Sequence, residues 1–225
     1  VPALKGAVTF GDAGSVLTGA ALIMGLMLGG VIGDYREAEK LPAAIGGGLL
    51  GLEAYAKRAL HVVDKDNSWV HGRLATVAHA VNEWLYGRMD TASMWAAYDE
   101  VNKVCDDVAK QGATVPYVNQ LHAANNGLGG AIDRVDGIRS TSYIKSGYAL
   151  MEFLVGIVLV LMVVCSFDNA VANWLVPGAI SMVYVFMVLF IKDLDNPFGW
   201  GENGGKGSAA DVDSGYWDSA YRAYQ

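Results

Sequence analysis

Two apolar runs of membrane length lie close together in the second half of the 225-residue sequence, at 148–166 and 174–191. A helix rises about 1.5 Å per residue, so each run approaches the roughly 30 Å thickness of a bilayer's hydrocarbon core. A short polar connector, residues 167–173, separates the two runs, and a charged, turn-forming segment follows them at 192–200. This pattern predicts a transmembrane hairpin over residues 147–191.

A third apolar run, residues 16–33, precedes the hairpin and carries small residues four positions apart. That spacing places them on one helix face. In a membrane, such a face lets the backbone of another helix approach closely. The alternative is that the stripe only reflects a sequence with 28 glycines. We interpret it as a helix-packing face, made of Ala21, Gly25, Gly29 and Gly33.

Composition and periodicity indicate the fold class. The sequence is 53% hydrophobic and only 17% charged, which is typical of a membrane protein. Helical spacing recurs between the first span and the hairpin, and no run has the period of a strand. We therefore predict an all-α integral membrane protein with three transmembrane helices. Its expected parts are an N-terminal segment (1–15), a first transmembrane helix (16–33), a helical extramembrane domain (34–146), the hairpin (147–191) and a C-terminal tail (192–225).

The C-terminal tail combines a glycine-rich stretch with four aromatic residues near its end. Glycine-rich segments are commonly disordered, but clustered aromatic side chains favour burial against a partner. Two interpretations stay open: a docking segment and a disordered terminus. The aromatic residues are Tyr216, Trp217, Tyr221 and Tyr224.

Basic residues predict the orientation of the spans. Of the 16 Lys and Arg residues, only Lys5 lies on the side of the connector, while 12 lie in the helical domain and 3 in the tail. Positive charge accumulates on the side that is not translocated. We expect the domain and the C-terminus to face cytoplasm, stroma or matrix, and the N-terminus to face a lumen. The first residue, Val1, suits a cleaved leader, so we expect an organellar membrane, with a thylakoid favoured over the mitochondrial inner membrane.

Several functional classes are disfavoured by the sequence. The net charge is −7 and no basic face exists, which argues against a nucleic-acid partner. The nucleophile elbow, the phosphate-binding loop and the kinase loop are absent, so we do not expect an enzyme. The histidines and cysteines lack the spacing of a zinc site, so we expect no metal.

Four side chains are candidate cofactor ligands. Glu152 is the only carboxylate well inside a span, and ionisable groups there often mark a pathway or a ligand site. The alternative is an interfacial glutamate that pairs with Lys145 or Arg139. Neutral imidazole is a good axial ligand, although surface histidines with no ligand are commoner. The cofactors to consider are chlorophyll, carotenoid or lipid, with His71, His79 and His122 as the other candidate ligands.

The segment after the last span contains the most specific motif, Asp195, Asn196, Pro197 and Phe198. Proline cannot continue a helix, so the chain should turn along the interface, where Phe198 and Trp200 suit an aromatic belt. With the segments 34–39, 138–143 and 148–150, the stretch 192–198 resembles a family of bestrophin-like membrane proteins, and more remotely the bestrophin anion channels, most specifically at 196–199.

The resemblance implies a pentameric anion pore. Bestrophins have four spans, however, and this sequence has three. Their acidic calcium clasp is replaced here by a glycine-rich segment at 200–206, so we do not expect calcium gating.

Two functional hypotheses follow. One is an accessory subunit of a large organellar membrane complex, bound to other subunits and lipid, for example a pigment-binding subunit associated with a photosystem. The other is a bestrophin-like anion channel that associates with itself. The start at Val1, the small-residue face and the aromatic tail favour the accessory subunit, and the motifs favour the channel. From the sequence alone we prefer the accessory subunit.

Overall fold

The chain divides into two compact units. The computed structural model describes residues 8–140, 145–167, 169–200, 208 and 210–225. One unit, which we call the membrane unit, comprises Val1–Tyr35 and Thr141–Asn196. The other, the bundle unit, comprises Arg36–Ser140 and Pro197–Gln225.

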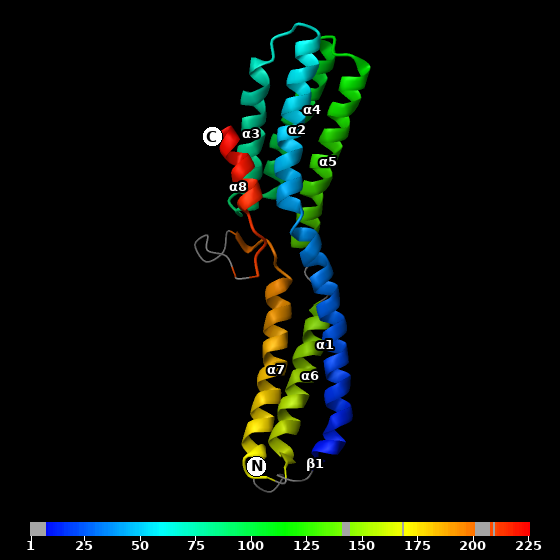
Figure 1. Cartoon of the computed structure of the whole chain (residues 1–225), viewed down its shortest axis with the longest axis vertical. Helices are drawn as coiled ribbons and strands as arrows, with labels where there is room; N and C mark the ends of the chain where they lie inside the picture. The colour runs from blue at the N-terminus through cyan, green and yellow to red at the C-terminus, as the bar shows by residue number, and fades with distance from the viewer. Residues whose placement is uncertain (1–7, 141–144, 168, 201–207, 209) are drawn as a thin grey trace. The chain divides into compact units, whose positions relative to one another are not determined.

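Three long helices build the membrane unit (Figure 1). They are α1 (Phe10–Ala38), whose last residues belong to the bundle unit, α6 (Lys145–Val164) and α7 (Ala172–Leu194). Three segments in the described part of the chain are long and apolar enough to cross a membrane: Phe10–Val62, Gly147–Val164 and Ala172–Leu194. The predicted fold class, an all-α membrane protein with three spanning helices, is confirmed.

The membrane unit has a thin core and a wide exposed apolar surface. Methionines fill much of the core, with Met24 on α1 and Met151 on α6 almost completely buried. The hydroxyl of Tyr184 on α7 donates to the carbonyl of Leu17 on α1 across 2.6 Å, which joins the first and third spans. At most 28% of the apolar window of each span is buried. Helices that are apolar all round need an apolar solvent, as a bilayer provides.

A short parallel pairing joins the start of α1 to the end of α6. The strands β1 (Val8–Thr9) and β2 (Cys165–Ser166) align Val8 with Cys165. Thr9 then caps α1, because its Oγ1 accepts from the N–H of Asp12 at 3.2 Å while the Asp12 carboxylate accepts from Thr9. This capping box starts the helix at Phe10, six residues before the apolar run predicted at 16.

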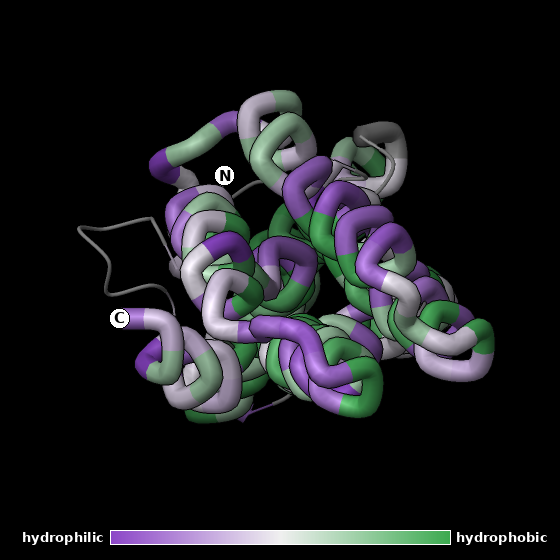
Figure 2. Tube along the Cα trace, turned by 90° about the horizontal axis from the view of Figure 1, so that it is seen from above, coloured by the Kyte–Doolittle hydropathy of each residue, from purple (hydrophilic) through white to green (hydrophobic). Residues whose placement is uncertain are grey.

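Four helices form the core of the bundle unit. Each buries an apolar face, and in Figure 2 hydrophobic and hydrophilic segments alternate along their tubes. Pro42 lies in the first turn of its helix, where the missing N–H costs nothing. The helices are α2 (Leu41–Val62), α3 (Ser68–Leu85), α4 (Thr91–Lys110) and α5 (Val115–Ser140).

The glycines in α5 do not interrupt the helix, although Gly127–Gly130 is a weak point by helix propensity. The hydroxyl of Tyr98 on α4 reaches over α5 and donates to Asn125 Oδ1 at 2.7 Å. A Cβ at Gly129 would lie 3.3 Å from that hydroxyl. Gly129 therefore makes room for an interhelical hydrogen bond that offsets part of its propensity cost.

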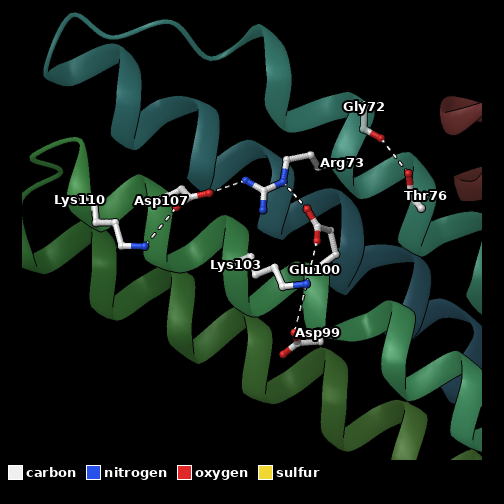
Figure 3. Close-up of polar contacts among 8 residues, drawn as sticks. All are labelled: Gly72, Arg73, Thr76, Asp99, Glu100, Lys103, Asp107 and Lys110. Atoms are coloured by element: carbon white, nitrogen blue, oxygen red, sulfur yellow. Dashed lines mark hydrogen bonds and ion pairs between the residues drawn. The ribbon is translucent and has the colours of Figure 1, made fainter.

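Charged residues connect α3 to α4 at the bundle surface. Arg73 on α3 donates to Glu100 and, at 2.6 Å, to Asp107, both on α4 (Figure 3). Lys103 and Lys110 extend the network along α4 (Figure 3). The Arg73 guanidinium lowers the pKa of both carboxyls. The carboxylate-rich stretch 99–107 is thus a structural ion-pair face.

The C-terminal residues dock on the bundle of the same chain. They form α8 (Gly215–Tyr221) and a 3₁₀ turn, η3 (Arg222–Tyr224), that lie beside α2 and α3 (Figure 1). Trp217 is fully buried, and its Nε1 donates to Asn82 Oδ1 at 3.0 Å. A Cβ at Gly46 would lie 2.8 Å from the Cβ of Ala220, so α8 fits only against a glycine there. The aromatic end of the tail is therefore a docking segment, but it docks on its own chain and not on the partner expected from the sequence.

Candidate functional site

The small residues of α1 form an exposed face within the membrane unit. Ala21, Gly25, Gly29 and Gly33 are all exposed, and we call them the glycine face. Among the described residues, nothing lies within 4 Å of a Cβ added at any of the three glycines. A glycine in a helix interior costs about 0.5–1 kcal/mol relative to alanine. Packing against the described residues does not require these glycines, and the face they form is exposed.

Glu152 forms an ion pair between two spans. Its carboxylate lies 2.5 Å from Lys192 Nζ, and the two side chains are 57% and 43% exposed. Close by, the hydroxyl of Tyr148 on α6 donates to Asp195 Oδ2 at 2.5 Å. The sequence analysis considered other partners for Glu152 and missed Lys192, because only the packing of α6 on α7 brings together residues 40 positions apart. The pair fastens the end of α7 to α6.

The aromatic residues of the exit segment are buried in protein. Phe198 and Trp200 belong to the bundle unit and are only 4% and 5% exposed. The predicted place of both rings in a lipid-facing aromatic belt is therefore wrong. Trp200 Nε1 donates to the Val212 carbonyl at 2.7 Å, and Val212 N donates to the Pro197 carbonyl at 2.9 Å. These bonds tie the exit segment to the chain that leads into α8.

Arg139 is the charged group at the centre of this region. Its guanidinium donates to the carbonyls of Trp84, Leu85 and Phe198. It also lies over the rings of Trp84 and Phe198, with centroids at 5.0 and 5.6 Å. Burial lowers the pKa of Arg139 to about 10. The side chain thus caps the end of α3 and holds the exit segment, as favoured for a cation near a helix C-terminus.

Two of the three candidate histidines contact the C-terminal segment. His71 Nδ1 lies 3.0 Å from Glu53 Oε1, and the ring stacks on Tyr224 with centroids 5.3 Å apart. His79 Nδ1 lies 3.0 Å from the Tyr221 hydroxyl. These positions give both side chains a structural role in docking α8 and η3.

The other candidate ligands lie elsewhere. His122 is exposed on α5, while Glu152 belongs to the membrane unit. The four side chains therefore come from three helices and do not form one common site within either unit. Their role as pigment ligands stays a prediction.

Glu53 is the most buried carboxylate among the described residues of the bundle. Burial alone would raise its pKa, but hydrogen bonds, led by that from Lys57 at 2.5 Å, outweigh burial and lower it. In the described part of the chain, no group of three or more His, Cys, Asp and Glu side chains could hold a metal ion. Of the segment 200–206 that replaces the calcium clasp, all residues after Trp200 lie outside the described residues.

Comparison with solved structures identifies the fold. A bestrophin homologue from Klebsiella pneumoniae matches with a TM-score of 0.73 and 13% identity, over 96% of this chain and 86% of that chain. A variant of a Klebsiella pneumoniae bestrophin homologue matches with a TM-score of 0.73 and 12% identity, over 96% and 87%. A membrane protein variant matches with a TM-score of 0.75 and 13% identity, over 96% and 86%.

The similarity is one of structure. No protein-family model matches the sequence, and no curated protein matches it significantly. The structural match extends over nearly the whole chain, including the region 45–125, where the sequence resembled the family only in being helical. The predicted remote resemblance is confirmed at the level of the fold. This chain has the fold of the bacterial bestrophin homologues.

Proposed function

We propose that this chain is the subunit of a homo-oligomeric membrane channel that conducts anions. The observation that carries the proposal is the similarity to the bestrophin homologues over 96% of the chain. The sequence analysis preferred an accessory subunit of an organellar complex. The fold supports the channel hypothesis better, and it gives no support to a pigment-binding or photosynthetic role.

The glycine face supports association between copies. In a membrane, small residues promote helix association because backbones can approach closely. The glycine face is exposed on α1, and two large apolar residues, Leu22 and Leu26, flank it with 64% and 70% of their surface exposed. A second copy of the chain would cover this surface and would account for glycines that packing within one chain does not explain.

The chemistry of α1 is compatible with anion passage. From Ala13 to Gly33 the helix contains no ionisable residue, so its wall presents no carboxylate that would repel an anion. Hydroxyl groups lie on the exposed surface at Ser15 and Thr18. We infer that α1 faces both its neighbouring copies and the conduction pathway.

Reconstitution of the full chain tests the function. We expect the purified protein to form a homo-oligomer in mild detergent and to give anion-selective currents in planar bilayers, with chloride flux into liposomes. Empty liposomes and heat-denatured protein are the controls. A monomer without conductance would contradict the proposal. Co-purification with unrelated subunits and an absorption spectrum of chlorophyll or carotenoid would instead support the accessory subunit.

We also propose that the bundle unit faces the side that retains positive charge. The 12 basic residues of the helical domain, against Lys5 alone on the connector side, support this orientation. Single cysteines at exposed positions test it: Ala170→Cys in the connector and Thr114→Cys between α4 and α5. A membrane-impermeant maleimide applied to intact cells should label Ala170→Cys and spare Thr114→Cys. The opposite labelling would reverse the orientation.

A further inference from the structure

A cavity of about 410 Å³ lies between α6 and α7, near the connector. We call it the connector cavity. Pro177 and Gly178 leave space in the wall of α7, and no described atom lies within 4 Å of a Cβ added at Gly178. The residues that line it are Met162, Val163, Cys165, Asn173, Trp174, Pro177, Gly178 and Ser181.

One backbone group in this wall lacks its usual helical partner. Pro177 has no N–H, so it cannot donate to the carbonyl of Asn173, four residues earlier. The Asn173 side chain is already engaged, because its Oδ1 accepts from Phe167 N at 2.9 Å and its Nδ2 donates to Phe167 O at 2.8 Å. In hydrocarbon, a freed carbonyl is re-satisfied by a nearby donor. Asn173 is one of the residues that line the cavity, so this carbonyl belongs to the wall at the connector end.

The rest of the wall is suited to an acyl chain. Met162, Val163 and Gly178 present an apolar surface, and Ser181 lies about 12 Å further along α7, as eight residues of helix require. Trp174, at the connector end, is 81% exposed, which suits a ring at the bilayer interface. The molecules that surround these spans are bilayer lipids, since the outer faces of α6 and α7 are exposed and apolar.

We propose that the connector cavity binds one membrane lipid with a hydroxyl-bearing headgroup. A headgroup hydroxyl donates to the Asn173 carbonyl, and an acyl chain lies along Met162 and Gly178 towards Ser181. The site is formed by one chain and does not require ion conduction. The proposed lipid site can therefore be confirmed or rejected whether or not the protein is a channel.

Photoreactive lipids test this site. The full chain is reconstituted in liposomes with either of two probes of zero net charge that share the same diazirine-bearing acyl chain, a galactosyl diacylglycerol or the zwitterionic phosphatidylcholine. The galactosyl headgroup has hydroxyl donors and phosphocholine has none. We expect the galactosyl probe to label peptides 162–165 and 173–181 several-fold more than the phosphatidylcholine probe. Equal labelling by both probes, spread over the exposed faces of α6 and α7, would overturn the proposal.

Two neighbouring substitutions provide a matched control. Gly178→Phe fills the connector cavity, whereas Ala179→Phe adds the same ring at an exposed position that does not line it. We expect Gly178→Phe alone to reduce the labelling to that of the phosphatidylcholine probe. If Gly178→Phe does not fold, Val163→Phe fills the cavity from α6. A folded cavity-filled variant that labels like wild type would show that the lipid lies elsewhere.

Discussion

In the bundle unit, Gly46 and Gly48 lie where a side chain would meet Ala220 at 2.8 Å and Leu128 at 3.3 Å. In the membrane unit, Gly25 and Gly29 lie where, within the described structure, a Cβ would meet no atom inside 4 Å. The first pair of glycines is required by contacts inside the chain. The second pair costs helix stability without such a contact among the described residues, and the proposed association between copies would explain why glycine stands there.

Burial shows the same contrast. The bundle buries large side chains completely, as at Leu74, Ile132 and Trp217. Its Arg73 ion pairs lie at the surface. The membrane unit leaves large apolar side chains such as Phe186 and Leu189 exposed. The bundle is therefore stabilised by burial away from water, whereas the exposed apolar surface of the membrane unit needs an apolar solvent such as a bilayer.

The largest expected effect is the loss of the oligomer on substitution of Gly29 by Leu. The added side chain would hold a neighbouring helix away from the glycine face without clashing inside its own chain. We expect association to weaken at least a hundredfold, about 3 kcal/mol, while helix content is retained. Analytical ultracentrifugation in detergent and circular dichroism measure the two quantities.

Gly156→Leu is the control for that substitution, because Gly156 is also exposed in a span and lies on α6, away from the glycine face. Its oligomeric state should not change. If Gly29→Leu assembles and conducts like the wild type, then α1 does not form the interface. The exposed glycines of α1 would then not be explained by association between copies.

The next largest effect concerns the docking of α8. Gly46→Val places a side chain against Ala220 and should cost about 1–3 kcal/mol of stability through overpacking. Gly47→Val, at the neighbouring position, has no described atom within 4 Å of its Cβ and should be nearly neutral. Thermal unfolding and limited proteolysis of the C-terminal segment distinguish the two variants. Equal stability of both would show that the close approach at Gly46 does not hold α8.

The helices and spans could be predicted from the sequence because their signals are local. The apolar runs and the helical spacing between them depend on residues within a few positions of one another. The cap at Thr9 was missed, so α1 begins six residues before the predicted run. The contacts that organise the bundle depend on distant residues. Trp217 bonds Asn82, 135 positions away, and His79 meets Tyr221, 142 positions away. Periodicity indicates which face of a helix a residue lies on, but not which distant residue it contacts.

Part of the candidate site was predictable for the same reason. The spacing of Gly25 and Gly29 indicated a helix face, and that face is exposed. The sequence placed Phe198 in lipid because an aromatic residue after a span usually lies in the aromatic belt. In the structure Phe198 is buried in the bundle unit instead, because the Arg139 guanidinium lies over its ring and donates to its carbonyl.

A smaller effect is expected from acid, which should lower the stability of the bundle unit. Arg134 lowers the pKa of Glu37, Arg73 lowers that of Glu100, and Arg88 lowers that of Glu83. A carboxyl whose pKa is lowered by folding stabilises the folded state fully when the pH is above its ordinary pKa of about 4. This stabilisation is lost as the pH falls through the pKa that the carboxyl has in the folded protein. We therefore expect unfolding to become easier below about pH 4.

Tryptophan fluorescence measures this acid effect selectively, because five of the six tryptophans, all but Trp174, lie in the bundle unit. Arg73→Gln removes the partner of two carboxyls and should make the acid dependence shallower. A wild-type stability that stays constant from pH 7 to pH 3 would contradict the assignment of these ion pairs to the bundle's stability.

The smallest effect is expected from Glu152→Gln in the membrane unit. Both partners of the ion pair are about half exposed, and an exposed pair typically contributes about 0–1 kcal/mol. Glutamine keeps the shape and can still accept a hydrogen bond from Lys192, so thermal stability and oligomeric mass should change little. A loss of conductance at unchanged stability would give Glu152 a role in ion passage. A large loss of stability would mean that this pair, like the contacts of the bundle, is essential within the chain, and the contrast between the two units would weaken.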